Sequence, residues 1–417
     1  MGCSSSTSEP VEEYTHPNTP VQKPGAKSVP GLTPGIPYDL PAVVPKVAET
    51  VPQAYQRLDE EICLLESTCP GPRLLTAEAW VDHLTKLFDE QFRNNDELYS
   101  HHQQLRGNSK LMMDTSKMVD IPNGIPDASK MGPDTASQSV DDTAKVRRIA
   151  IKLDIALNPD KAARQEEFIA RISRSAMELE SERFRADMID HARDRALHLR
   201  QSFGRLKVLY LELDHLLAAA NNGTYSSLAE ERFDSELESL REIRDRLGGV
   251  SEQWRAAGAF MRAAAKGVLQ AVEFWNLVGP SQNAPEKVAL ALDCRTACHG
   301  ALIALEAAHA ALPQVEIPHV TPRQQTAVKH GLVYMLTDMA NRDRYRHTKH
   351  VLEGFQHNVE KSVQWVHNTY QETLKKDLNE ADQNVMLVAK QLREVRKRFL
   401  AQRFGAKIYV RPALPIQ

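Results

Sequence analysis

The sequence predicts an all-α protein: an elongated antiparallel helical bundle or coiled coil with long helices, preceded by a disordered N-terminal tail. The chain has 417 residues, of which 42% are hydrophobic and 26% charged, so most of it can fold. Only 6% of the residues are aromatic and only 19 are glycine, a composition that favours helices over β-sheets. From residue 158 onward, apolar residues recur every three or four positions, as on one face of a helix.

Composition divides the chain into four segments. Residues 1–50 are rich in Ser, Thr, Pro and Gly and predict a disordered tether, because proline interrupts helices. Residues 51–106 predict a short helical hairpin with one apolar stripe on each helix. Residues 107–144 have no sustained period and many turn formers, as in a linker, and residues 145–411 predict the long-helix domain.

The start of the long-helix domain has two interpretations. Residues 148–157 (RIAIKLDIAL) alternate between apolar and polar, as in a strand, and their one candidate partner is 407–411 (KIYVR). An isolated pair of short strands is marginal in water. A helical lead-in is therefore an equal alternative for this stretch.

Three segments rich in turn formers separate the long helices that we expect: 221–227, 279–285 and 313–322. Asn158 and Pro159 start the first long helix, because Asn caps free amides and Pro loses nothing at the first turn. We expect the last helix to run without a break from about 323 to 404.

Apolar residues at heptad spacing predict two seams, over 189–217 and over 378–399. Long helices can bury such stripes only by lying along other helices. If the partners are not in the same chain, a homodimer would supply them.

The first six residues, MGCSSS, match the myristoylation pattern M-G-x-x-x-[ST]. This chemistry needs Gly2, because the acylated amine must be unhindered once Met1 is removed. Cys3 supplies a neighbouring thiol for palmitate, and two acyl chains hold a protein stably where one does not. The alternative is an ordinary initiator methionine followed by a polar tail.

Basic residues are densest near the end of the last helix, at Lys390, Arg393, Arg396, Lys397, Arg398, Arg403 and Lys407. Anionic lipid or a protein partner would be attracted to such a face. The alternative is a solvated helix face that binds nothing.

No constellation of residues predicts a catalytic or metal site, so we expect neither an enzyme nor a cofactor. Cys294 and Cys298 stand one turn apart, but zinc needs four ligands, and buried apolar side chains explain them better. His347, His350 and His357 lack a matched carboxylate or thiol and are expected in solvent. The net charge of −3 and the absence of interleaved aromatics disfavour nucleic acid as a partner.

Five cysteines at irregular spacing, without a secretory signal, indicate reduced thiols in the cytosol. No apolar run reaches the roughly 20 residues that span a bilayer, so membrane contact must come from an anchor or a surface.

These observations predict a scaffold or adaptor that acyl chains tether to the cytosolic face of a membrane and that binds protein partners through its helices. The alternative is a dimeric module that presses a basic face on curved lipid. The long helices resemble BAR-type crescents in their general proportions.

Overall fold

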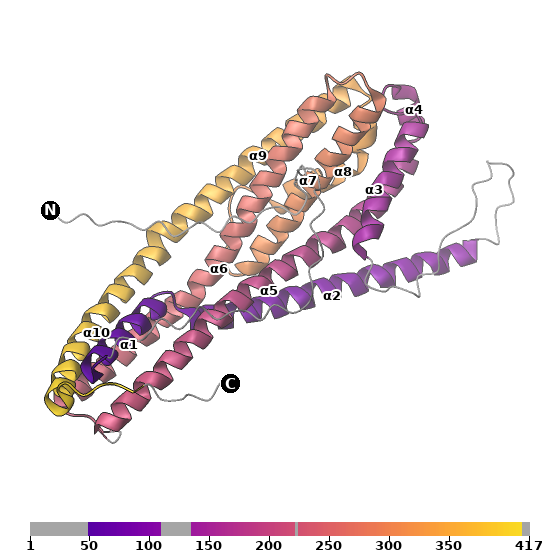
Figure 1. The fold of residues 1–417 in the computed structure, drawn as a ribbon. Coiled ribbons are helices and arrows are strands. Elements are labelled where there is room, and N and C mark those ends of the chain that lie inside the picture. The colour runs from indigo at the N-terminus through magenta and orange to yellow at the C-terminus, as the bar shows by residue number, and fades with distance from the viewer. Residues whose placement is uncertain (1–48, 110–134, 222–223, 411–417) are drawn as a thin grey trace, which may run out of the picture. The chain divides into compact units, whose positions relative to one another are not determined.

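A computed structural model of the chain describes residues 49–109, 135–221 and 224–410, with side chains at 49–90, 143–221 and 224–410. These residues fold into helices joined by turns, as Figure 1 shows. Within the described ranges the β-type pairing is confined to one isolated antiparallel bridge, between Thr50 and Ile408. The prediction of an all-α protein is confirmed.

The chain forms two compact units, each assembled from segments that are distant in sequence. The described part of the first unit comprises 79–109, 135–193 and 255–367, and that of the second comprises 49–78, 194–221, 224–254 and 368–410. The long helices α2 (Pro70–Ser109), α5 (Glu166–Asn221) and α6 (Leu228–Val278) each contribute to both units.

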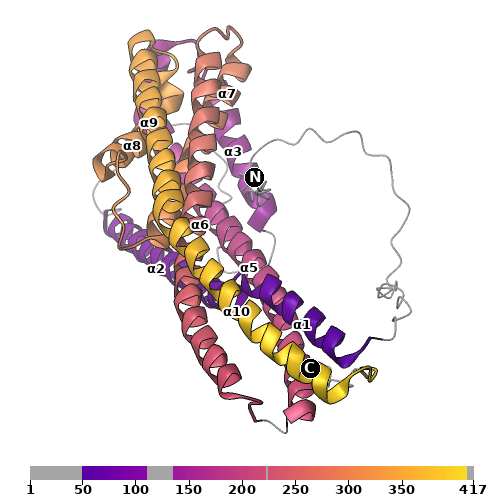
Figure 2. The same ribbon diagram turned by 90° about the vertical axis from the view of Figure 1, so that its left-hand side faces the viewer.

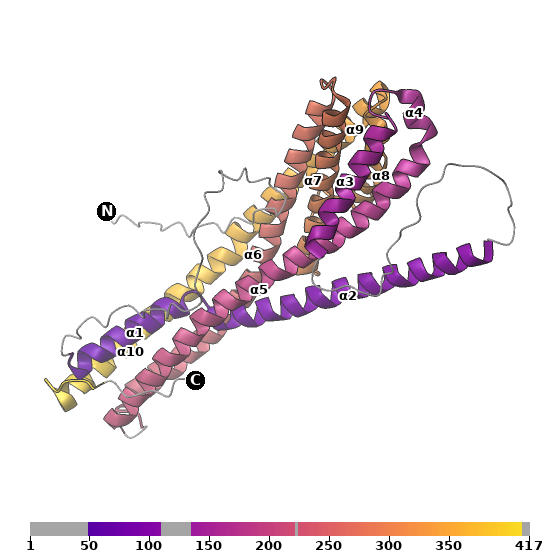
Figure 3. The same ribbon diagram turned by 45° about the vertical axis from the view of Figure 1, so that its right-hand side comes forward.

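The first unit is built around α7 (Ala284–Ala311), which is buried along most of its length. Helix α3 (Thr135–Lys152) lies beside α7, as Figure 3 shows, and α8 (Pro322–Asp338) also packs on it. Gly267 of α6 permits a close helix contact, because a Cβ there would lie 2.9 Å from the carbonyl oxygen of Ala297. The small α4 (Pro159–Arg164) and the long α9 (Arg342–Thr369) complete this unit.

Helix α7 is also the one helix, among the described residues, that is long and apolar enough to cross a membrane. The expectation that no apolar run reaches the length of a bilayer span is therefore wrong for α7, by length and composition. In the first unit 78% of its most apolar part is buried, as in the core helix of a folded domain.

The second unit places α1 (Val51–Glu66) along α10 (Lys375–Phe404), as Figure 2 shows. Tyr55, Leu58 and Ile62 of α1 are buried against the second half of α5. Leu400 near the end of α10 joins the same cluster. A further cluster joins Cys63 of α1 to apolar residues of α6 and α10.

Both predicted seams are buried by other helices. Ala192, Ala196 and Leu199 pack against α2, and Leu206, Leu209 and Leu213 pack against α1. On α10, Val385, Val388 and Leu392 pack against Leu237 of α6. The seams therefore supply no argument for a homodimer.

Short polar residues fix several helix starts. The Asn158 side chain accepts a hydrogen bond from the Lys161 amide at α4 (3.2 Å), and the Thr321 hydroxyl accepts one from the Gln324 amide at α8 (3.2 Å). Proline follows each cap, where its missing N–H costs nothing. The predicted breaks are confirmed, since helices end at Asn221, Val278 and Ala311.

The expectation of an unbroken helix from 323 to 404 is wrong. Helix α8 ends at Asp338 and α9 begins at Arg342. The cause is Asn341, whose side chain accepts hydrogen bonds from the amides of Asp343 (2.9 Å) and Arg344 (3.2 Å) and so caps a new helix. A π-helical turn, η1 (Tyr370–Leu374), then joins α9 to α10.

Two smaller corrections concern the start of the long-helix domain. Helix α3 runs to Lys152, and Val146 and Ala150 form its buried face, so the helical lead-in is right and the strand is wrong. Ile408 of the supposed partner strand pairs with Thr50 instead. The first long helix is also interrupted at Gln165, between α4 and α5.

Candidate functional site

The chain enters the described structure directly beside the C-terminal end of α10. The Val51 amide donates to the Lys407 carbonyl (3.1 Å), and the Tyr409 amide donates to the Glu49 carbonyl (2.7 Å). The predicted lipidation residues Gly2 and Cys3 lie outside the described residues. The segment that carries them therefore joins the body where the basic part of α10 ends.

Two of the seven predicted basic residues are engaged in ion pairs inside the second unit. Arg393 pairs with Asp59 of α1, and its Nη2 lies 3.5 Å from the Cys63 sulfur. Arg396 bonds to Glu230 (2.8 Å) and Asp234 (2.9 Å) of α6. These arginines fasten α10 to its neighbours, so their charges are satisfied within the protein.

Burial and hydrogen bonding shift the pKa values of these partners in opposite directions. Burial raises the pKa of the Asp59 carboxyl, although Arg393 opposes it. Burial also acts to raise the pKa of Glu230, but hydrogen bonds from Ser226 and Arg396 lower it below its usual range. Glu230 is thus held as a carboxylate that neutralises Arg396.

The other five basic residues are not held in this way. Lys390, Arg398, Arg403 and Lys407 are exposed and Lys397 is half-buried. Among the residues with described side chains, none forms an ion pair with these five. The Arg403 guanidinium lies over the Phe399 ring, 6.0 Å from its centre, and the Lys407 ammonium lies 5.6 Å from the centre of Phe404.

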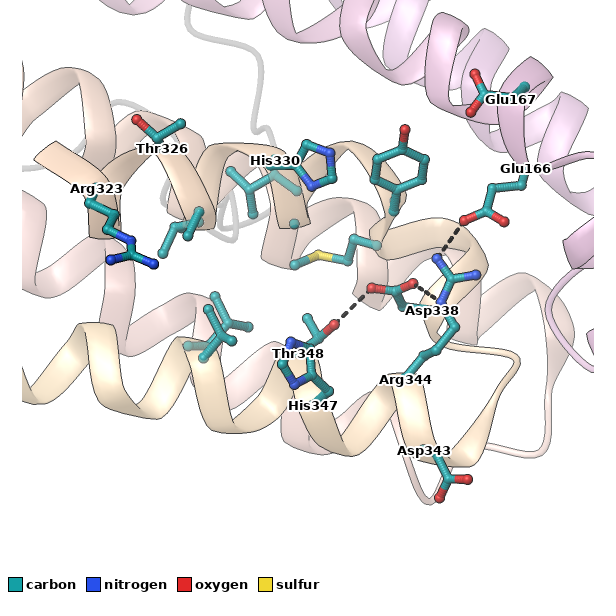
Figure 4. A pocket seen from close by; sticks show the side chains of 18 residues that line it. Glu166, Glu167, Arg323, Thr326, His330, Asp338, Asp343, Arg344, His347 and Thr348 are labelled. Atoms are coloured by element: carbon teal, nitrogen blue, oxygen red, sulfur yellow. Dashed lines mark hydrogen bonds and ion pairs between the residues drawn. The ribbon is translucent and has the colours of Figure 1, made fainter.

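The first unit contains a separate groove of about 1200 Å³ between α8, α9 and the start of α5. Its apolar lining comes from Val328, Leu332, Met335, Val351 and Leu352. Figure 4 shows Arg323 toward one end and Glu166, Glu167 and Arg344 at the other, with His330 and His347 between them. The groove thus combines an apolar lining with ionisable side chains.

Arg344 is fixed at its end of the groove. Its Nη2 lies 2.5 Å from Glu166 and its Nε 2.7 Å from Asp338, which also accepts the Thr348 hydroxyl (2.8 Å), as Figure 4 shows. The hydrogen bond to Glu166 raises the pKa of Arg344. Burial raises the pKa of Asp338, against the opposing effect of Thr348 and Arg344. The guanidinium of Arg344 is thus engaged by the carboxylates of Glu166 and Asp338 rather than directed at a ligand.

A buried polar cluster lies between α5 and α7 in the first unit. Arg295 is fully buried and bonds to Glu180 (2.6 Å) and to the Ser173 hydroxyl (3.2 Å). His299, one turn further on α7, places Nδ1 3.5 Å from Glu180 and Nε2 3.1 Å from the Ser181 hydroxyl. Sequence reasoning missed this cluster, although Arg295 and His299 at i and i+4 share one face of α7.

Electrostatics keep Glu180 charged and His299 neutral. Burial acts to raise the pKa of Glu180, but Arg295 and His299 lower it below the ordinary value. Burial lowers the pKa of His299, although Glu180 opposes this. At pH 7 the contact between His299 and Glu180 is therefore made by a neutral ring and is not an ion pair.

Ser181, His299 and Glu180 place a hydroxyl, an imidazole and a carboxylate in the order found in a hydrolase catalytic triad. The surroundings of these three side chains, however, differ from those of a hydrolase active site. The Ser181 hydroxyl donates to the Met177 carbonyl (2.9 Å), which competes with His299. Both Glu180 and Ser181 lie inside α5, where backbone amides are used by the helix and cannot hold an oxyanion. We interpret the cluster as a structural ion-pair network.

The cysteines and histidines singled out from the sequence are dispersed. Cys294 and Cys298 are fully buried on α7, and burial raises the pKa of the Cys298 thiol to about 12. His347, His350 and His357 are exposed on α9. Among the described residues, no three side chains of His, Cys, Asp or Glu are placed to hold a metal ion.

No family model, no curated protein and no solved structure matches this chain.

Proposed function

We propose that this protein is a helical scaffold that acyl chains anchor to the cytosolic face of a membrane. The observation that carries the proposal is the start of the sequence, where Gly2 and Ser6 match the myristoylation pattern. Cys3 beside Gly2 provides a second acylation site. A second chain is needed because a single myristoyl group binds membranes only marginally.

The helical body supports the scaffold part of the proposal, because it presents apolar side chains to solvent at helical spacing. On α5, Leu197, Val208 and Leu211 lie on one face and are 51%, 45% and 51% exposed. Such a strip suits the apolar face of a partner helix. The groove beside α8 and α9 offers a second apolar surface in the first unit.

The alternative of a dimeric module that bends membranes has less support. It needs the whole basic face of α10 directed at lipid, and Arg393 and Arg396 are engaged by Asp59 and Glu230. The predicted seams on α5 and α10 are buried within the protein, so they are not available as a dimer interface.

The proposal is tested by metabolic labelling with an alkyne myristate and by fractionation of cells that express Gly2→Ala, Cys3→Ser or wild-type protein. We expect Gly2→Ala to lose the label and to move into the soluble fraction. Cys3→Ser should keep the label but bind membranes weakly and reversibly. Ser4→Ala is the matched control, because it leaves M-G-x-x-x-S intact.

Fractionation at low and high salt separates the anchor from charge attraction, since salt screens only the latter. Gly2→Ala that stays on membranes in high salt would overturn the acyl anchor. Wild-type protein that incorporates no myristate would overturn it as well.

A further inference from the structure

We propose that the C-terminal end of α10 and the segment after it form a surface that binds anionic lipid headgroups at the base of the N-terminal tether. Its cations are Arg398, Arg403 and Lys407, and its apolar part is Ile408 and Val410. The inference deepens the proposed function, because it gives the acylated protein a second membrane contact. Its chemistry, however, does not depend on acylation.

The end of α10 carries an excess of positive charge. Arg398, Arg403 and Lys407 are all exposed, and no ion pair within the described side chains neutralises them. The sequence has no acidic residue after Glu394. Arg393 and Arg396, by contrast, are matched by carboxylates of α1 and α6. The positive charge left over is therefore concentrated toward the end of α10.

The aromatic residues beneath these cations hold them at the surface. Phe399 and Phe404 pack against the buried cluster of α1 and α5. The Arg403 and Lys407 head groups lie over these two rings, so their aliphatic stems follow apolar surface and their charges remain in water. The cations are thus carried on a fixed element of the fold.

The segment after α10 exposes two aliphatic side chains beside these cations. Ile408 and Val410 are 63% and 83% exposed, while Tyr409 between them donates a hydrogen bond to Glu212 of α5 (3.3 Å). Extended backbone points alternate side chains to opposite faces, so Ile408 and Val410 face away from the body. Aliphatic side chains next to cations are typical of segments that lie in the interface of a bilayer.

The surface lies where the N-terminal part of the chain joins the second unit. Backbone hydrogen bonds join Glu49 and Val51 to Tyr409 and Lys407. The segment that carries Gly2 and Cys3 therefore joins the second unit beside this surface. Anionic lipid is the occupant that uses both parts of the surface, because a soluble phosphate would leave Ile408 and Val410 without a contact.

The test is sedimentation of unacylated full-length Gly2→Ala protein with vesicles of phosphatidylcholine, with or without phosphatidylserine. We expect binding only to vesicles that contain phosphatidylserine, with an affinity that falls as salt rises. Adding Arg398→Gln, Arg403→Gln and Lys407→Gln should weaken binding about 100-fold, since each cation near an anionic leaflet contributes roughly a factor of five. Ile408→Asn with Val410→Asn should weaken binding at every salt concentration.

A charge-matched control replaces three exposed cations elsewhere: Arg164→Gln, Lys361→Gln and Lys376→Gln. It should bind like the parent protein, and circular dichroism should show all variants equally helical. Equal binding by both triple variants, or equal binding to both kinds of vesicle, would overturn the inference. Vesicle binding without myristate labelling in cells would remove the acyl anchor and leave this surface, whereas labelling without vesicle binding would do the reverse.

Discussion

Trp275 and Tyr345 bind each other through two reciprocal hydrogen bonds in the first unit. The Trp275 indole donates to the Tyr345 carbonyl (3.1 Å), and the Tyr345 hydroxyl donates to the Trp275 carbonyl (3.1 Å). Their rings stack with centres 5.2 Å apart. The pair joins the end of α6 to the first turn of α9, and Gly279 leaves room for the phenol.

Gly279→Ala should destabilise the first unit. The new Cβ would lie 2.7 Å from the Tyr345 hydroxyl oxygen, so the ring must move away from Trp275. We expect a loss of about 1–3 kcal/mol, as for other overpacked sites, in urea unfolding followed by tryptophan fluorescence. Gly331→Ala on α8 is the control: no atom lies within 4 Å of its Cβ, so it should be neutral or stabilising.

Tyr345→Phe should isolate one of the two hydrogen bonds. It removes the donor to the Trp275 carbonyl and keeps the stacked ring. We expect a loss of about 1 kcal/mol, together with a change in indole fluorescence as the ring relaxes. Unchanged stability and fluorescence would show that the phenol hydroxyl does not hold this pair.

Arg295→Met should be among the most destabilising substitutions in the first unit. It leaves Glu180 buried without its cation, and breaking a buried pair on one side costs about 3–5 kcal/mol. Combining it with Glu180→Gln should recover much of that loss, because no uncompensated charge remains. A double variant as unstable as Arg295→Met would contradict this account; thermal unfolding at pH 7 measures both.

The stability of the first unit should fall as the pH is lowered below 6.5. Burial lowers the pKa values of folded His299 and His309 below the ordinary 6.5, so in this range the unfolded chain binds more protons. Glu180, whose pKa is also lowered, adds to the loss below pH 4.5. His299→Gln should make the decline in stability between pH 7 and 5 less steep. The test is the difference between the urea unfolding midpoints of the wild-type and His299→Gln proteins, measured across that pH range. A constant difference would exclude His299 as its source.

Local signals in the sequence predicted much of the fold. The cap and proline at Asn158 and Pro159, and the heptad seams, concern residues within a few turns of one another, and the structure follows them. Gly248 and Gly249 show where local reasoning stops. Two successive glycines weaken a helix locally, yet α6 is continuous there, and a Cβ on Gly248 would lie 2.6 Å from the Cβ of Cys69. Gly248 packs closely against Cys69, and Gly249 packs against the first turns of α2, which only the fold reveals.

The candidate surfaces were less predictable for the same reason. Arg393 and Arg396 look like their basic neighbours in the sequence, but the acids that engage them lie on α1 and α6. Glu180 likewise meets Arg295 from a distant helix. Helical periodicity says which residues share a face but not which face of another helix they meet. The acylation of Gly2 and Cys3 stays a prediction, since those residues lie outside the described part of the chain.

The pairing of Glu49 and Val51 with Tyr409 and Lys407 also has a mechanical consequence. A pull applied at Glu49 reaches the second unit at this junction. There the pull acts on α1, which begins at Val51, and on the segment after α10, because the Tyr409 amide donates to the Glu49 carbonyl. Tyr409 transmits part of this pull to α5, because its hydroxyl donates a hydrogen bond to Glu212. A pull applied at Glu49 would thus load α1, α5 and the end of α10 together.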